Sequence, residues 1–362
     1  MRIHFISGFL GSGKTTTIIN TAKILMKQGL KVGVVTNDQG RFLVDSHFIH
    51  TSGIPSVEVS SGCFCCNYDD FESHVISLAD NEKPDIIFAE SVGSCADIIA
   101  TVMKPFMEFR AKYSQLSCLS AFADARMLRA RLSGNALPFS DSVIYIFDKQ
   151  LEEADILIIN KSDLLSDKDG AALLEKAMQR FPEKTILLQS AFSRPELTAW
   201  FRQADSLSVL NIDKPSMQMD YEQYASGELK LAWFDKVFSI SSAQNIPSAV
   251  IREMLSGINR KLKDSSTPVG HLKVFADTAA SGAFKYSLTG MDAEESNFSY
   301  PENPGKEISF VLNARVENSP QFLSDLIKSV LSDVIINNNL IMKEKEENAF
   351  KPGKPAPIHR IA

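Results

Sequence analysis

The sequence predicts an α/β protein in which a doubly wound, mainly parallel sheet is followed by a smaller C-terminal α+β domain. Three observations predict this. Apolar runs alternate with helical patterns over roughly the first two hundred residues, and a glycine-rich loop separates the first run from the first helical pattern. After residue 231 the order changes to strand, helix, three strands and helix. A chain of 362 residues is long enough for two domains.

The first domain is expected to span residues 1–204. Its apolar runs are rich in Val, Ile and Phe, which is typical of strands that helices cover on both faces. The pattern at 15–28 carries one apolar stripe at helical spacing and ends at Gly29, and further helical patterns fall at 69–78 and 168–181. Strands that alternate with helices imply right-handed crossovers and parallel pairing. The expected strands are 3–7, 31–36, 57–60, 85–91, 116–124, 155–160 and 185–190.

The second half of the chain shows a different pattern. Residues 205–230 have weak periodicity and are expected to form a linker. The second domain, 231–338, is expected to have helices at 247–262 and 321–336, with an antiparallel sheet. Residues 339–362 are charged and proline-rich, so we expect a disordered tail. The expected strands of the second domain are 233–240, 271–276, 284–288 and 308–316.

The composition excludes several classes of protein. The net charge of −6 provides no basic field for nucleic acid or for an anionic membrane. No run reaches the roughly 20 apolar residues of a membrane-spanning helix, and the first residues lack the pattern of a signal peptide. Five unevenly spaced cysteines do not make a secreted disulfide framework. We therefore expect a cytoplasmic protein that binds neither nucleic acid nor a membrane.

A phosphate-binding loop follows the first predicted strand. The stretch GFLGSGKT, from Gly8 to Thr15, fits G-x-x-x-x-G-K-[ST] between a strand and a helix. Its backbone N–H groups and the helix N-terminus favour phosphate, the ammonium of Lys14 is expected to reach the β- and γ-phosphates, and the hydroxyl of Thr15 is expected to bind Mg²⁺. The fold class is therefore that of a P-loop NTPase. The residues assigned to the nucleotide phosphates are Gly8, Gly11, Ser12, Gly13, Lys14, Thr15 and Thr16.

The base is predicted to be guanine. The sequence NKSD follows the apolar strand at 155–160, and ligands bind beyond the carboxyl ends of such strands. Asp163 can accept two hydrogen bonds from guanine N1–H and its amino group, whereas adenine would leave this carboxylate unpaired. Asn160 is expected to brace neighbouring loops, and the stem of Lys161 to cover the base. Ser190 and Ala191, after the next strand, are expected near the base edge. GTP and GDP are thus the predicted ligands.

Three acidic residues are candidates for sensing the γ-phosphate. Asp38 and Asp45 follow the second strand, where either could hold Mg²⁺ or orient the attacking water. Glu90 ends another core strand, and Gly93 follows three residues later, which is where a Mg²⁺-directed acid and a phosphate-sensing N–H belong. We assign Lys14, Asp45 and Glu90 to catalysis, and Thr15, Asp38 and Glu90 to Mg²⁺.

Three of the five thiols stand together in SSGCFCC, at Cys63, Cys65 and Cys66. Closely spaced thiolates bind Zn²⁺ or similar ions, and no second C-x-x-C pair completes a closed structural site, so an open, exchangeable metal site is predicted. Unremarkable reduced thiols and a redox sensor are the alternatives. Cys95 is either a further ligand or a packed small residue, and Cys118 is expected in the core.

The motifs GFLGSGKTT, VVTNDQG, SSGCFCC, an acid followed three residues later by glycine, and NKSD occur in this order over roughly residues 1–200. Together they resemble the CobW family of metal-associated P-loop GTPases, which includes cobalamin-biosynthesis proteins, nitrile hydratase activators and zinc chaperones. The resemblance implies Mg²⁺-dependent GTP hydrolysis, Zn²⁺ or Co²⁺ at the C-x-C-C motif between the switch regions, and a nucleotide-dependent homodimer. One departure is Arg41 after Gly40, where the family usually has glutamate.

The function that we expect is a GTPase metallochaperone, which couples its nucleotide state to delivery of Zn²⁺, Co²⁺ or a metallocofactor into a client metalloprotein or corrinoid-dependent protein. One alternative is a GTPase that activates or remodels such a client without carrying free metal. A small-molecule kinase is the second alternative, against which the NKSD motif argues.

Overall fold

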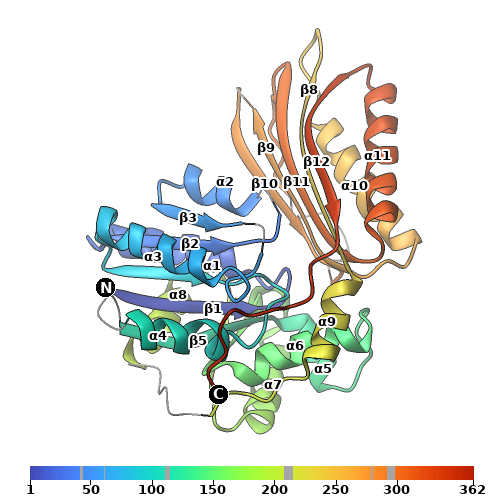
Figure 1. The fold of residues 1–362 in the computed structure, drawn as a ribbon. Coiled ribbons are helices and arrows are strands. Elements are labelled where there is room, and N and C mark those ends of the chain that lie inside the picture. Colours follow the sequence, from blue (N-terminus) through green and yellow to red (C-terminus); the bar gives the residue numbers. More distant parts are fainter. Residues whose placement is uncertain (41–43, 61, 111–114, 208–214, 279, 292–297) are drawn as a thin grey trace. The chain divides into compact units, whose positions relative to one another are not determined.

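The computed structural model describes residues 1–362 apart from 41–43, 61, 111–114, 208–214, 279 and 292–297 (Figure 1). The chain divides into two compact units. The first comprises Met1–Gln39, Ile49–Glu228 and Lys354–Ala362, and the second comprises Gly40–Phe48 and Leu229–Gly353. No helix among the described residues has the length and apolar character that crossing a membrane requires.

The first unit is built on a seven-stranded sheet in the order β3-β2-β4-β1-β5-β6-β7, and each neighbouring pair is parallel. Strands β2, β4 and β6 are buried along their whole length, which explains the apolar runs that precede their polar last residues. The predicted doubly wound α/β fold is confirmed. The strands are β1 (Arg2–Gly8), β2 (Val32–Asn37), β3 (Ser56–Val59), β4 (Ile86–Glu90), β5 (Gln115–Asp124), β6 (Ile156–Asn160) and β7 (Thr185–Gln189).

Helices connect these strands and cover the sheet (Figure 1). α1 packs on α8, and α6 packs on β1 and β5. The helix α2 (Val44–Thr51) begins in the segment that belongs to the second unit. The others are α1 (Lys14–Lys27), α3 (Tyr68–Glu82), the π-helical η1 (Ile99–Met103), α4 (Lys104–Arg110), α5 (Ala125–Leu132), α6 (Asp141–Glu153), the 3₁₀ turn η2 (Ser162–Leu164), α7 (Asp167–Arg180), α8 (Arg194–Ser206) and α9 (Tyr221–Lys230).

The second unit has a five-stranded antiparallel sheet in the order β10-β9-β11-β8-β12. Helices α10 and α11 pack on each other and supply much of the apolar core, together with the strands. The predicted order of strand, helix, three strands and helix is therefore present. The elements are β8 (Leu231–Ser241), α10 (Ala249–Asp264), β9 (Val269–Thr278), β10 (Gly282–Leu288), β11 (Glu307–Glu317), α11 (Pro320–Asn337) and β12 (Ile341–Phe350).

The region 339–362 differs from the expected disordered tail. Residues 341–350 form the edge strand β12, which pairs with β8. Its charges have a structural partner, because the fully buried ammonium of Lys236 on β8 lies 2.8 Å from carboxylates of both Glu344 and Glu347. A run of Lys and Glu that is typical of solvated chain is therefore also compatible with a charged edge strand.

The expected linker at 205–230 also differs in part. Helix α8 continues to Ser206, and α9 occupies 221–230. Helix α9 is held by close packing, since a Cβ at Gly227 would lie 2.3 Å from the carbonyl oxygen of Ser142 on α6. The buried residues of α9 are Tyr224, Gly227 and Glu228, which do not give the apolar stripe that predicts a helix.

Candidate functional site

The loop after β1 encloses the amino end of α1. Gly8 has a φ of +133°, and a Cβ there would lie 2.2 Å from the carbonyl oxygen of Phe122. Gly13 has a φ of +90°, and a Cβ there would lie 2.4 Å from Nδ2 of Asn160. Both positions therefore require glycine. The first N–H groups of α1 have no helical partner, and with the helix dipole they make an anion site. The other predicted loop residues, Gly11, Ser12 and Thr16, lie in the same stretch.

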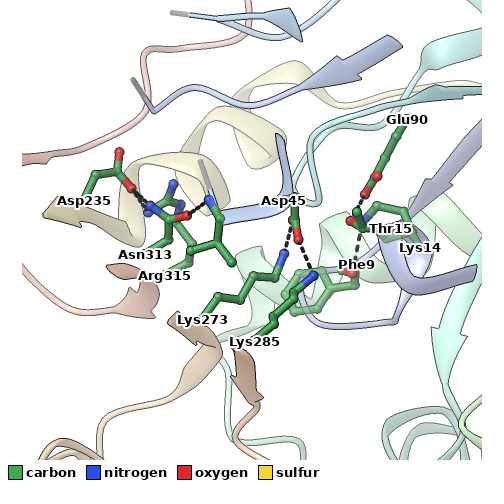
Figure 2. Close-up of polar contacts among 12 residues, drawn as sticks. Phe9, Lys14, Thr15, Asp45, Glu90, Asp235, Lys273, Lys285, Asn313 and Arg315 are labelled. Atoms are coloured by element: carbon green, nitrogen blue, oxygen red, sulfur yellow. Dashed lines mark hydrogen bonds and ion pairs between the residues drawn. The ribbon is translucent and has the colours of Figure 1, made fainter. Parts of the chain in front are cut away.

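The two side chains at the start of α1 point to different partners (Figure 2). The ammonium of Lys14 donates to the carbonyl oxygens of Gly8, at 2.6 Å, and Phe9, at 3.4 Å, so it is held at the loop. The hydroxyl of Thr15 donates to a carboxylate oxygen of Glu90 at 2.9 Å. A hydroxyl beside a carboxylate is an oxygen set that suits Mg²⁺, so these residues fit the predicted ion. The predicted Mg²⁺ ligands Thr15 and Glu90 are thus in direct contact.

Gly93 lies next to the phosphate loop. A Cβ there would lie 2.8 Å from Cδ2 and 3.1 Å from the backbone nitrogen of Leu10, so a side chain would require Leu10 to shift. The side-chain amide of Gln150 on α6 donates to the carbonyl oxygens of Gly93, at 3.0 Å, and Cys95, at 2.8 Å. Gln150 therefore fixes the segment after β4 to α6.

The two acids after β2 lie in different units. Asp38 follows β2 directly, and its N–H donates to the carbonyl oxygen of Val59. Asp45 lies in α2, within the second unit, where its carboxylate accepts from Lys273 and, at 2.8 Å, from Lys285 (Figure 2). Burial alone would raise the pKa of Asp45, but the two lysine charges outweigh it and hold the pKa well below its usual range. The assignment of Asp45 to catalysis stays a prediction.

The motif NKSD leaves β6 beside the phosphate loop. Asn160 donates to the carbonyl oxygen of Ser12 at 2.7 Å, so it braces that loop. Lys161 has a φ of +63°, and its ammonium lies 3.0 Å from Asp124. Asp163 is exposed in η2, where a base can reach its carboxylate.

The loop after β7 contributes the last predicted residues. The N–H of Ser190 donates to the carboxylate of Glu196, and the carbonyl oxygen of Ala191 accepts from Asn20 on α1 at 2.8 Å. These contacts fix the loop to α1 and α8.

Sequence reasoning missed Asp124 as a site residue. It ends β5, in register with Asn160 on the neighbouring β6, and it pairs with Arg126 and Lys161. Burial raises the pKa of Asp124, but the hydrogen bonds and charges of the two basic side chains lower it to about 2. The available signal was a polar residue at a strand end, which becomes informative once β5 is known to lie beside β6.

The thiol loop, residues 62–67, gathers three sulfur atoms into one cluster. The Sγ–Sγ distances are 2.9 Å for Cys63–Cys65, 3.2 Å for Cys63–Cys66 and 3.8 Å for Cys65–Cys66. Zinc–sulfur bonds of 2.3 Å at tetrahedral angles place sulfurs about 3.8 Å apart, so a small opening around Cys63 would admit the ion. Among the described residues, the predicted thiol cluster (Cys63, Cys65 and Cys66) is a group whose ligand atoms lie close enough together to hold a metal ion.

Among the three clustered thiols, Cys63 has the lowest pKa. Hydrogen bonds from Cys65, Cys66 and Cys95 lower the pKa of Cys63 well below its usual range. The hydrogen bond with Cys63 raises the pKa of Cys66 to about 11, and the pKa of Cys65 is raised well above normal for the same reason. A metal ion would stabilise all three thiolates and release the remaining protons, so binding is expected to depend on pH.

Two buried groups lie next to the thiol cluster. Cys95, which the sequence left open between ligand and packing, is fully buried, and its interaction with Cys63 together with burial raises the pKa of its thiol well above the usual range. Glu228 on α9 is also buried, and burial together with the charge of Cys63 raises its pKa well above the usual range. Sequence reasoning did not identify Glu228, because it lies in the expected linker.

Asn37 connects the thiol loop to the sheet. It is the last residue of β2, and its side chain accepts from the N–H of Phe64 at 2.8 Å and donates to the carbonyl oxygen of Gly62 at 2.7 Å. The preceding residue, Thr36, pairs in register with Glu90 on β4. Carboxyl ends of parallel strands lie along one edge, so the thiol loop and the Thr15–Glu90 pair share the same edge of the sheet.

The parallel sheet, the glycine loop, and the lysine and threonine at the start of α1 define a P-loop nucleotide-binding protein. Residues 2–189, which are more than half of the chain, match the family described as CobW/HypB/UreG, nucleotide-binding domain. The chain belongs to this family, and the predicted CobW-type P-loop GTPase class is confirmed.

Curated relatives support the same family assignment. The chain is 26% identical over 205 residues to "Zinc chaperone CobW" from Sinorhizobium sp, covering 51% of this chain and 57% of the relative. It is 30% identical over 187 residues to "Zinc chaperone YeiR" from Escherichia coli (strain K12), covering 50% and 51%. It is 28% identical over 223 residues to "Zinc-regulated GTPase metalloprotein activator 1" from Dictyostelium discoideum, covering 53% and 46%. The chain thus spans about half the length of the curated relatives that it matches.

Proposed function

We propose that this protein is a GTPase metallochaperone, which binds Zn²⁺ or Co²⁺ at the thiol cluster and delivers the ion, or a metallocofactor, to a client metalloprotein. The observation that carries the proposal is the set of contacts of Asn37, which ties the thiol loop to the strand beside Glu90. The printed names of the relatives, zinc chaperones and a zinc-regulated GTPase activator, support the same role.

Nucleotide binding would use the residues at the carboxyl edge of the sheet. Phosphate oxygens would accept from the loop N–H groups and displace the carbonyl partners of the Lys14 ammonium. The carboxylate of Asp163 would select guanine through two hydrogen bonds. Thr15 and Glu90 would hold Mg²⁺, which neutralises phosphate charge when bound. Asp38 and the N–H of Gly93 are the candidates for sensing the γ-phosphate.

The metal is cargo in this proposal. The thiol cluster supplies three thiolates, two from well-buried residues and one from the half-buried Cys66, which gives the ion a route in and out. Loss of the γ-phosphate would relax the segments after β2 and β4, and Asn37 would transmit this change to the thiol loop. A coupling of about 1–3 kcal/mol between the two sites would change metal affinity roughly 5- to 150-fold.

The experiment is to purify the wild type and the Cys65→Ser/Cys66→Ser double variant without chelator, and to measure bound zinc by elemental analysis. We expect about one ion per chain in the wild type and little in the double variant, because a single remaining thiolate binds zinc weakly. Cys118→Ala, in the core of β5, is the control and should retain the ion. Zinc bound equally by the double variant would refute the metal site.

Activation of the client separates the proposal from a GTPase that remodels its client without carrying metal. If the protein is a metallochaperone, the double variant should fail to activate a client even when it still hydrolyses GTP. Full activation by the double variant would favour the remodelling GTPase.

A further inference from the structure

The last residues of the chain lie along the first unit in an extended conformation. This segment, residues 354–362, belongs to the first unit and can be followed in Figure 1 as the red trace that ends at C. Its residues alternate between exposed and half-buried, which is the period of an extended chain with one side against a surface. The half-buried residues are Pro355, Pro357, His359 and Ile361.

The segment contacts the thiol loop through its backbone. The N–H of Ala356 donates to the sulfur of Cys66 at 3.3 Å, and the N–H of Ile358 donates to the carbonyl oxygen of Cys65 at 2.9 Å. Cys66 is the only half-buried thiol among the five cysteines, all of which are described. The segment therefore lies over the most accessible side of the thiol cluster.

An ion pair anchors the middle of the segment. The guanidinium of Arg360 donates through Nε to Asp97 at 2.8 Å and through Nη2 to the carbonyl oxygen of Met217 at 2.9 Å. The Asp97 side chain is 1% exposed, and its same oxygen accepts from the hydroxyl of Tyr221 at 2.7 Å. A carboxylate this deeply buried is costly without a cation, so Arg360 has a strong partner here.

Contacts on both sides of Arg360 hold the rest of the segment against the first unit. The ring of His359 lies with its centre 4.9 Å from the ring of Tyr68 and 5.0 Å from that of Phe109. Beyond Arg360, the N–H of Ile361 donates to the carbonyl oxygen of Ala100 at 2.9 Å, and the buried ammonium of Lys104 donates to the carbonyl oxygen of Ala362 at 2.8 Å.

We propose that this face of the first unit is a docking site for an extended peptide with the pattern Pro–x–His–Arg–apolar, that residues 354–362 occupy it within the chain, and that its occupancy limits access to Cys66. Docking is reversible, because all the contacts of the segment are non-covalent and Ile358 remains 48% exposed. Three prolines between 352 and 357 favour the extended form and keep the segment out of a sheet. The consequence for metal exchange rests on the proposed function, but the docking itself does not.

The test compares the wild type with Arg360→Ala, using Lys354→Ala as the control, since it removes a positive charge from an exposed position of the same segment. The first readout is the rate at which Cys66 of the metal-free protein reacts with iodoacetamide, with the labelled position identified by mass spectrometry. The second is the rate of zinc transfer to a chromogenic chelator. Loss of a charged hydrogen bond should raise both rates about tenfold in Arg360→Ala, and Lys354→Ala should match the wild type.

A synthetic peptide of residues 354–362 then tests the docking site directly. Added to Arg360→Ala, it should slow both reactions towards the wild-type rates, whereas the same peptide with alanine in place of Arg360 should not. Unchanged rates in Arg360→Ala, or no effect of the peptide, would overturn the docking proposal. If the wild type binds no zinc, the metal-chaperone proposal fails, but the labelling of Cys66 still decides whether the segment docks.

Discussion

The contact between Thr15 and Glu90 shows how single residues set up the nucleotide site. One residue lies in the first turn of α1 and the other ends β4, yet their side chains hydrogen-bond inside the unit, with Glu90 only 8% exposed. The loop motif predicted Thr15 because its signal is local. Glu90 was predicted only from its position at the end of an apolar strand. The order of the strands in the sheet was needed to show that the two residues meet.

Glu90→Gln should preserve the hydrogen bond from Thr15 and remove the negative charge that would hold Mg²⁺. We expect GTP hydrolysis to fall roughly 100-fold, because groups that place charge beside the transferred phosphate contribute on this scale, while GDP binding without Mg²⁺ stays near the wild-type value. Phosphate release and fluorescent-GDP titration measure the two quantities. Glu82→Gln, at the exposed end of α3, is the control. Wild-type hydrolysis by Glu90→Gln would contradict the assignment.

Glu153, the last residue of α6, gives a pH dependence of stability. Burial raises its pKa to about 8, the N–H of Ile99 works against this, and the charge of Asp97 adds to it. The pKa of Glu153 in the folded protein lies above the usual value of 4.5. The protonated carboxyl therefore makes its full contribution to folding stability below about pH 4.5, and this contribution is lost as the pH rises through 8.

Glu153→Gln keeps an acceptor for the N–H of Ile99 and cannot ionise. We expect the variant to be more stable than the wild type at pH 8.5, by up to about 4 kcal/mol, and to lose this advantage at pH 5. Urea denaturation at the two pH values provides the measurement. The exposed neighbour Glu152→Gln should follow the wild type. The prediction fails if Glu153→Gln and wild type change in parallel with pH.

At the scale of elements, the buried strands were predictable and the charged or irregular elements were not. Strands β2, β4 and β6 are mainly apolar up to their polar last residues because both faces are covered. The edge strand β12 has a sequence typical of solvated chain, and only the buried Lys236 on β8 explains its glutamates. Helix α9 was missed because a glycine and a glutamate take buried positions in it.

The edge strand therefore makes a testable contribution to the stability of the second unit. Glu344→Gln/Glu347→Gln would leave the ammonium of Lys236 buried with neither carboxylate. We expect a loss of about 3 kcal/mol in the free energy of unfolding, because removing the partners of a buried charge is strongly destabilising. Glu346→Gln, the exposed position at the bulge opposite Val237, is the matched control. Equal urea-denaturation midpoints for the double variant and the control would exclude this role.

At the scale of the whole molecule, the family motifs predicted the class of protein and named candidate residues for a nucleotide site and a metal site. They could not decide the roles of Asn37, Cys95 and Asp124, because these roles depend on which strands are neighbours and on how the loops fold back. The segment Gly40–Phe48, which follows β2, belongs to the second unit, where Val44 and Asp45 contact strands β9, β10 and β11. No sequence motif indicated that attachment.

We propose that nucleotide state and metal affinity are coupled through the shared edge of the sheet. The decisive measurement is the zinc affinity of the wild type with GDP and with a non-hydrolysable GTP analogue, by competition with a chelator. The account predicts tighter binding with the GTP analogue, by roughly 5- to 150-fold. In Asn37→Ala, which cannot hold Phe64 and Gly62, the two affinities should converge. Equal zinc affinities in the two nucleotide states of the wild type would contradict the account.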